Sequence, residues 1–166
     1  MQGASRDVRL WDAKLRAPFA VIGVRTDARA VTEVAYLPSE ERVQSASNPV
    51  AARAVDELKR YIADAEFEFT VPVAPRGTAF QQRVWMAIGA VPRGQSRTYG
   101  EIARTLVSAP RAVGQACGAN PIALIIPCHR VVGSRGALGG FMNASAGDPL
   151  AIKRWLLQHE GYRFGA

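Results

Sequence analysis

The stretch VPVAPRG at residues 71–77 divides the chain into two parts with different hydrophobic patterns. Two prolines and a glycine this close together interrupt both helices and strands, so they predict a linker near residues 72–77. Before the linker, FAVIGVRT (19–26) and VTEVAYLP (31–38) are rich in the β-branched and aromatic residues that favour strands. DARA (27–30) between them predicts a hairpin loop. The first part of the chain is therefore expected to form a small sheet.

Two further elements are expected before the linker. PVAARAVDELKRYIADA (49–65) carries apolar residues at helical spacing and opens with a proline, which is favoured at the first position of a helix. EFEFTVPV (66–73) alternates between polar and apolar residues and predicts another strand. SEERVQSASN (39–48) is typical of a loop.

The second part predicts a series of helices. TAFQ at 78–81 and TYGE at 98–101 both fit a capping box, in which a threonine caps the helix and the residue three positions later reaches back. A third helix is expected over 111–119, after the turn VSAP (107–110). Asp148 as N-cap and Gly161 as terminator bound a final helix.

These patterns predict an α+β fold in two domains. Residues 1–75 form the small β-rich N-terminal domain, and residues 76–166 form a mostly helical domain. Within the second domain, the two short helices joined by a tight turn at 107–110 predict a helix-turn-helix.

The positive charge of the chain is concentrated in its middle. Residues 76–135 hold eight arginines, no lysine and one acidic residue, Glu101, whereas residues 1–75 hold ten basic and eleven acidic residues. The planar guanidinium group suits phosphate oxygens and stacking on bases. Nucleic acid is therefore a candidate partner. A solvated basic face is the plainer alternative.

Several classes of protein are excluded. No apolar run approaches the roughly 20 residues that span a bilayer, and the polar start MQGASRDVRLWDAK is no secretion signal. We therefore expect a cytoplasmic protein with no membrane partner.

The only cysteines and histidines are Cys117, Cys128, His129 and His159, and their spacing fits no metal site. We expect neither a metal nor a cofactor.

The sequence IIPCHRVVG (125–133) places a titratable pair at the end of an apolar run. A thiol becomes a strong nucleophile only after it loses its proton, and an oriented base promotes this loss. Neighbours on a strand point to opposite faces, so Cys128 and His129 cooperate only if Pro127 bends the backbone. Among the acidic residues after residue 75, Glu101 and Asp148 are assigned to caps, which leaves Glu160 to orient His129.

Two enzyme classes fit this set of residues. A thiol hydrolase would use it for acyl transfer, and an alkyl acceptor would use it for displacement at a carbon bound to oxygen. The predicted helix-turn-helix favours the alkyl acceptor, because a hydrolase needs no DNA-binding element.

At this point a resemblance to a known family supports the second class. GTAFQQRVW, YGEIAR, RAVGQACGANP, IIPCHRVVG and KRWLLQHEG follow one another as in the O6-alkylguanine-DNA alkyltransferases, or methylated-DNA–protein-cysteine S-methyltransferases. The match is strong over about 76–166 and lies only in the general pattern over 1–75. The resemblance implies an RNase H-like N-terminal domain and a single-turnover transfer of an alkyl group from O6-alkylguanine, and from O4-alkylthymine, in duplex DNA. The base would be extruded from the stack for the reaction.

The resemblance also implies roles for individual residues. Cys128 would accept the alkyl group, His129 would relay its proton through a water, Glu160 would hold His129, and Asn120 would brace the turn beside them. Tyr99 would donate its hydroxyl toward the guanine, and Arg111 would enter the duplex in place of the extruded base. The remaining expected residues fall into two groups, the substrate-binding Val131, Phe141 and Met142 and the DNA-binding Thr98, Ala112, Gln115, Ala116 and Gly118.

Two departures from the family pattern bear on these expectations. The loop GGFMNASAGDP (139–149) is longer than usual, which affects the width of the pocket, and the turn LVSAP (106–110) is about two residues shorter than is typical. A monomer is expected, and assembly of several copies along DNA is left open. The alternatives are a lesion-binding relative that no longer transfers alkyl groups and, more remotely, a thiol hydrolase.

Overall fold

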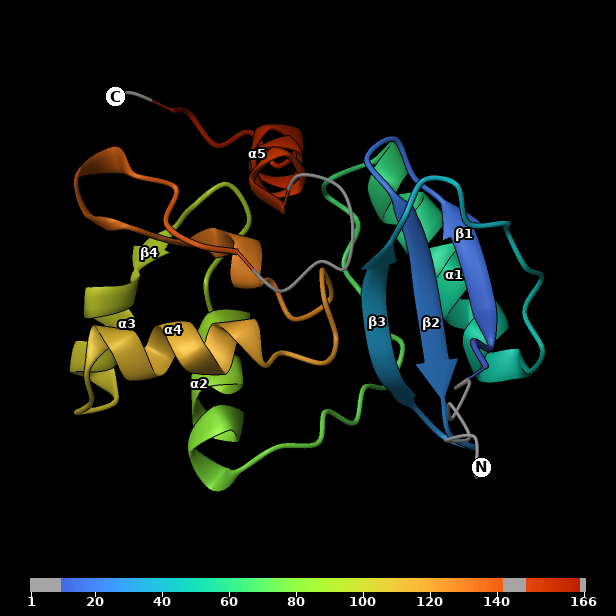
Figure 1. Ribbon diagram of the computed structural model, residues 1–166, viewed down its shortest axis with the longest axis horizontal. Helices are drawn as coiled ribbons and strands as arrows, with labels where there is room; N and C mark the ends of the chain where they lie inside the picture. The colour runs from blue at the N-terminus through green and yellow to red at the C-terminus, as the bar shows by residue number, and fades with distance from the viewer. Residues whose placement is uncertain (1–9, 142–148, 165–166) are drawn as a thin grey trace, which may run out of the picture.

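The computed structural model describes residues 10–141 and 149–164 of the 166-residue chain. A three-stranded sheet with one helix lies at one end of the molecule, and the remaining helices gather at the other end (Figure 1). This arrangement confirms the predicted α+β fold.

The sheet is antiparallel, with the strand order β1-β2-β3. β2 (Val21–Thr26) and β3 (Val31–Leu37) are the predicted hairpin, whereas β1 (Ala13–Arg16) was not predicted. Helix α1 (Pro49–Ala63) covers one face, begins at the predicted proline and is capped by the side chain of Asn48. Buried side chains of this helix pack into the core, namely Ala51, Ala54, Leu58 and Tyr61.

The strand predicted at 66–73 was wrong. Only Val73 makes a bridge, alongside Val31 at the edge of β3. Upstream of it, the backbone N–H groups of Thr70 and Val71 donate to the carboxylate of Glu57 instead of to a strand, with a distance of 3.0 Å for Val71. Pro72 carries no N–H at all. The alternation of this segment therefore serves aromatic packing, with the rings of Phe67 and Phe69 5.9 Å apart.

The second part of the chain forms four helices within the described residues, α2 (Ala79–Gly89), α3 (Tyr99–Thr105), α4 (Pro110–Gly118) and α5 (Pro149–His159). Both predicted capping boxes are present, at the starts of α2 and α3. The predicted cap Asp148 lies outside the described residues. Helices α3 and α4 pack against each other across a short turn at 106–109, which is the predicted helix-turn-helix (Figure 1).

Short elements connect these helices to the site. β4 (Arg97–Thr98) and β5 (Val131–Val132) form a parallel pair, and 3₁₀ turns η1 (Cys128–Arg130) and η2 (Ser134–Gly136) flank β5. The indole Nε1 of Trp85 donates a 2.9 Å hydrogen bond to the carbonyl of Ala116, which ties α2 to α4.

The two ends of the molecule share one continuous hydrophobic core. Val34 of β3 donates to the carbonyl of Pro121 at 2.9 Å, and Ala123 donates back to Val34 at 3.0 Å. The segment after α4 is thereby fixed against the sheet. The division of the chain at residues 75 and 76 stays a prediction.

Candidate active site

Cys128 opens a 3₁₀ turn directly after Pro127, and its side chain is buried at 3% exposure. The segment before it, Ile122 to Ile126, forms an apolar loop and not a strand. Pro127 lies at φ −83° and ψ 64°, where the backbone bends into the turn. The side chains of Cys128, His129 and Arg130 are therefore arranged around a turn and do not alternate between the two faces of a strand.

Asn120 braces this loop and contacts the sulfur. Its Nδ2 donates to the carbonyl of Ile126 at 3.0 Å and to Sγ of Cys128 at 3.1 Å, and its Oδ1 accepts from the N–H of Ile122 at 2.9 Å. A donor aimed at a sulfur atom favours the thiolate over the thiol.

Glu160 lies just beyond the end of α5 and receives several hydrogen bonds. Nε2 of His129 lies 2.8 Å from Oε1, and Nε and Nη2 of Arg130 each donate to the carboxylate at 2.9 Å. The hydroxyl of Tyr61, from α1, donates to the same Oε1 at 2.8 Å. Burial alone would raise the pKa of Glu160, but the hydrogen bonds from His129 and Arg130 outweigh it and hold the pKa well below its usual value. Glu160 is a carboxylate in this site.

The protonation of His129 follows from its partners. A carboxylate only accepts hydrogen bonds, so Nε2 carries the proton that faces Glu160, and Nδ1 carries a lone pair. Nδ1 is buried and has no hydrogen-bond partner among the described residues. Burial also lowers the pKa of His129, which keeps the ring neutral. His129 is therefore a base with a free lone pair, oriented by Glu160.

Two further groups set the charge around Cys128. The thiol of Cys117, in α4, interacts with it, and this neighbour together with burial raises the pKa of Cys128 well above its ordinary value, while Asn120 and Lys153 act in the opposite direction. Lys153 is fully buried on α5, and its Nζ donates to the carbonyls of Leu138 and Gly140. Burial lowers the pKa of Lys153 to about 8.

A cavity of about 510 Å³ opens beside the thiol. Helices α3 and α4 form one wall, and the loop after η2 forms the other. The hydroxyl of Tyr99 donates to the carbonyl of Gly140 at 3.0 Å across this cavity, and burial raises its pKa to about 12, so it keeps its proton. The lining residues are Tyr99, Pro110, Arg111, Gly114, Gln115, Cys117, Gly118, Cys128, Gly140 and Phe141.

Gly139 lets Tyr99 approach this loop closely. Its φ is 72°, and a Cβ at this position would lie 2.7 Å from the Tyr99 ring. Any other residue would push the ring and the loop apart and so change the shape of the cavity.

The predicted site residues fall into three groups. Six of them line the cavity: Cys128, Tyr99, Arg111, Gln115, Gly118 and Phe141. Asn120 donates to the sulfur, and His129, the next residue in the chain, is hydrogen-bonded to Glu160. Five predicted residues remain. Val131 is buried in β5, where it pairs with Arg97, and Thr98 caps α3. Ala112 is half-buried on α4, Ala116 belongs to the same helix, and Met142 lies outside the described residues.

Ala116 does not fit its predicted contact with DNA. It is 2% exposed, faces the core and gives its carbonyl to Trp85. The exposed face of α4 passes instead through Arg111 and Gln115.

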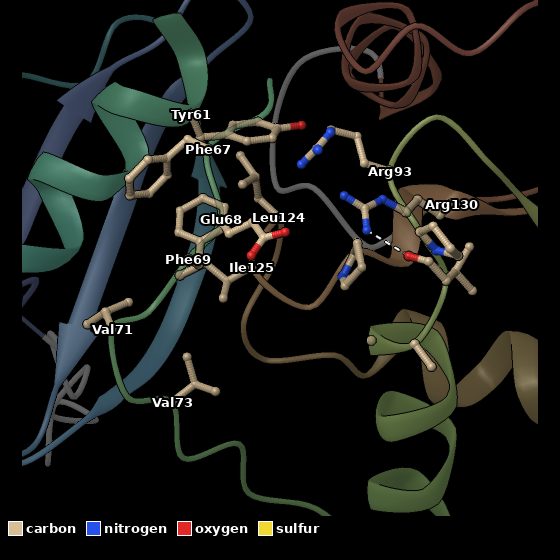
Figure 2. A pocket seen from close by; sticks show the side chains of 15 residues that line it. Tyr61, Phe67, Glu68, Phe69, Val71, Val73, Arg93, Leu124, Ile125 and Arg130 are labelled. Atoms are coloured by element: carbon tan, nitrogen blue, oxygen red, sulfur yellow. Dashed lines mark hydrogen bonds between the residues drawn. The ribbon is translucent and has the colours of Figure 1, made fainter. Parts of the chain in front are cut away.

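Four residues of the site were not among those predicted from the sequence, namely Arg130, Tyr61, Lys153 and Cys117. Arg130 clamps Glu160 and also donates to the carbonyl of Val91 at 2.8 Å (Figure 2). Tyr61 is 99 positions before Glu160, and no sequence pattern links the two. Lys153 did leave a signal, since it occupies the buried face of α5 beside Ile152 and Leu156.

A second cavity, of about 530 Å³, lies between the segment after α1 and the residues that follow α2 (Figure 2). Phe67 and Phe69 line one side, and Arg93 and Arg130 the other. Cys128 is not among its lining residues, so the chemistry belongs to the first cavity.

Within residues 10–141 and 149–164, no cluster of three or more candidate ligands for a metal occurs. No helix in these described ranges is both long and apolar enough to cross a membrane.

Comparisons with known proteins point to one family. A family model described as the DNA-binding domain of 6-O-methylguanine DNA methyltransferase matches residues 79–162. A methylated-DNA–protein-cysteine methyltransferase of Mycobacterium tuberculosis is 46% identical over 134 residues, which cover 79% of this chain and 77% of that protein. One of Shigella flexneri is 36% identical over 176 residues, with coverages of 93% and 98%.

Solved structures extend the similarity to the whole fold. A crystal structure of Mycobacterium tuberculosis OGT in complex with DNA matches with a TM-score of 0.75 at 39% identity, covering 89% of this chain and 90% of that one. A crystal structure of Mycobacterium tuberculosis O6-methylguanine methyltransferase gives a TM-score of 0.76 at 36% identity, with coverages of 95% and 97%. Both the sheet and the helical part are thus included, and the chain belongs to the methylated-DNA–protein-cysteine methyltransferase family.

Proposed function

We propose that this chain repairs alkylated DNA by moving an alkyl group from O6 of guanine to Sγ of its own Cys128, once per molecule. The observation that carries the proposal is the position of Cys128, which lines a cavity beside α4 and is backed by the His129–Glu160 pair. A nucleophile next to an oriented base is the arrangement that displacement chemistry requires.

The reaction proceeds by direct displacement. Nδ1 of His129 takes the proton of Cys128 through a water, and the thiolate attacks the alkyl carbon. A C–S bond forms, the C–O bond breaks, and the electron pair of that bond stays on O6 of guanine. The hydroxyl of Tyr99 keeps its proton and donates a hydrogen bond to the carbonyl of Gly140 in the free protein; it turns toward the purine as this charge develops. The thioether product is a poor leaving group, so the protein is consumed.

The target base must leave the helix, because a thiolate cannot reach O6 inside the stack. Arg111 is exposed at the start of α4 and at the edge of the cavity, where it can fill the space of an extruded base. Gly114 and Gly118 let the backbone of α4 approach the duplex closely. Few side chains of this helix can read base edges, so we expect little dependence on sequence. Thr98, Ala112 and Gln115 would contact DNA on the same side of the molecule as Arg111.

The proposed substrates include O4-alkylthymine beside O6-alkylguanine. Phe141, Val131 and Met142 are proposed to shape the substrate site. The protein acts as a monomer in the cytoplasm on nucleoid DNA, with residues 1–75 and 76–166 as its domains. Binding experiments on long duplexes would show whether several copies assemble side by side along DNA.

Two other functions are weaker fits. A lesion-binding relative without transfer activity needs no thiol, whereas here Cys128 faces the cavity with a complete base behind it. A thiol hydrolase would not need the exposed arginines of α3 and α4, Arg104 and Arg111.

One experiment separates the three functions. The protein is incubated with excess duplex carrying O6-methylguanine, and its intact mass is measured over time, with Cys128→Ser as the control. The proposal predicts a gain of one methyl group per chain, no further turnover and no gain in the control. Tight binding with unchanged mass would indicate the lesion binder. Turnover of a thioester without DNA would indicate the hydrolase.

A further inference from the structure

The turn between α3 and α4 holds an apolar residue in an unfavourable backbone conformation. The N–H of Ser108 donates to the carbonyl of Ala103 at 2.8 Å, and the N–H of Val107 donates to that of Arg104 at 3.3 Å. This pair of bonds defines a Schellman helix end, in which glycine usually occupies the left-handed position. Here that position is Val107, with φ at 54°. A β-branched side chain in this region crowds its own backbone.

Packing does not offset this strain. Val107 is 94% exposed, the most exposed large hydrophobic residue in the described ranges. The turn itself is held from outside, since Nη2 of Arg83 donates to the carbonyl of Leu106 at 3.2 Å. Both the conformation and the exposure of Val107 count against the stability of the free protein. Strained residues of this kind concentrate at binding sites.

The surroundings of Val107 favour a nucleic acid as the contact. Residues 107–111 are exposed without a break, and the last two, Pro110 and Arg111, line the cavity that contains Cys128. Arg104 and Arg111 are exposed on either side of the turn, and the nearby carboxylate of Glu101 is engaged in its capping box. Proteins that insert an apolar side chain between or against bases commonly surround it with cationic side chains that bind the phosphates. Arg104, Val107 and Arg111 follow this pattern.

We propose that Val107 is a DNA-contacting residue, whose isopropyl group packs against sugar and base edges of the duplex beside the point where Arg111 enters. The inference rests on the proposed function and adds a contact to it. Binding of DNA would then bury a side chain that the free protein leaves in water, and this gain offsets the strain of the turn.

Substitution of Val107 tests the inference because folding and binding should respond in opposite directions. In Val107→Gly, relief of the strain should raise the melting temperature by a few degrees. Loss of the buried isopropyl group should weaken binding to a short duplex with one lesion by about tenfold. The dependence of binding on salt should not change, because no charge is removed.

Two further variants separate the backbone effect from the contact. Val107→Ala removes the methyl groups but keeps a Cβ in the left-handed region, so it should lose affinity with a smaller gain in melting temperature. Val43→Ala is the matched control, because Val43 is 58% exposed in the loop before α1. It should change neither quantity. Binding is measured in the Cys128→Ser background so that no alkyl transfer interferes.

The outcomes distinguish the inference from the proposed function. If the wild-type protein binds and repairs the duplex and Val107→Gly binds it equally well, Val107 makes no contact and the inference is overturned. A defect of Val107→Gly that occurs only on long DNA carrying several copies would assign Val107 to a contact between protein molecules, which also overturns it. If the wild-type protein neither binds nor repairs the duplex, the proposed function fails first.

Discussion

The hydroxyl of Tyr61, on helix α1 beside the sheet, donates a 2.8 Å hydrogen bond to Glu160, the carboxylate that orients His129. The N-terminal part of the chain thus takes part in the support of the acceptor site. His159 adds a second link, since its Nε2 lies 2.7 Å from the carbonyl of Tyr61.

Tyr61→Phe should therefore affect both stability and repair. Removing a hydrogen bond to a buried carboxylate should cost about 2 kcal/mol of unfolding free energy, and methyl transfer should slow as Glu160 loses a donor. Urea unfolding and single-turnover transfer measure the two effects. Tyr36→Phe is the control, because the Tyr36 hydroxyl is buried without a hydrogen-bond partner among the described residues, and its loss should leave stability unchanged or raised. Equal effects of both variants would contradict the role of Tyr61.

Acid should destabilise the protein through Glu160. Its pKa in the folded state lies below the usual value, so the stabilisation is fully present above the unfolded pKa and is lost as the pH falls toward the folded one. The free energy of unfolding should therefore decrease below about pH 4.5, near the ordinary pKa of a glutamate. Glu160→Gln should be less stable at pH 7 and should show a flatter pH dependence. A slope as steep as that of the wild type would mean that another carboxylate dominates.

Lys153 should limit repair at alkaline pH. Burial lowers its pKa to about 8, and above this pH the loss of its charge removes a field that favours the Cys128 thiolate. The rate of transfer should fall above about pH 8 in the wild type, and this descending limb should be absent in Lys153→Met, whose rate is low throughout. Lys153→Arg keeps the charge and should move the limb to higher pH. Superimposable profiles for all three proteins would exclude Lys153 from the chemistry.

Removing the Cys117 thiol should make Cys128 more reactive. The hydrogen bond between the two sulfur atoms lowers the pKa of Cys117 and raises that of Cys128, so Cys117→Ala should lower the pKa of Cys128, because no second sulfur is left to take up the negative charge first. Alkylation of Cys128 by iodoacetamide, followed against pH, should begin at lower pH in the variant. An unchanged midpoint would show that burial and not Cys117 controls the thiol.

Arg111→Ala should slow repair of duplex DNA much more than reaction with free O6-methylguanine base. Arg111 lines the mouth of the cavity but makes no hydrogen bond to Cys128, His129 or Glu160 among the described residues, so its removal should spare the chemistry. Single-turnover rates with both substrates provide the comparison. The same loss with both would contradict a role in base extrusion.

Local sequence patterns predicted most of the elements correctly. The hairpin of β2 and β3 and the capped starts of α2 and α3 follow from residues close together in the chain. The failure at 66–73 has a long-range cause, because the Glu57 carboxylate accepts the N–H groups of Thr70 and Val71 in place of a neighbouring strand. β1 was missed because it is short, with four residues.

The residues of the site also divide into those that local sequence could predict and those that depend on tertiary packing. Cys128 and His129 are adjacent, and Glu160 could be reached by eliminating carboxylates already used as caps. Tyr61 could not be found from sequence, because its position near Glu160 depends on how α1 and α5 pack. Arg130 stands beside His129, but its two bonds to Glu160 appear only when the 3₁₀ turn is formed.

The proposed chemistry depends on the sulfur of Cys128 as the acceptor of the alkyl group. The most direct test is peptide-level mass spectrometry after reaction with a duplex carrying O6-methylguanine, because the chain has only two cysteines and both line the cavity. A methyl group is expected on the peptide with Cys128, in an amount that plateaus at one per chain, and none is expected on Cys117. A methyl group on Cys117, or repaired DNA with both thiols unmodified, would contradict it.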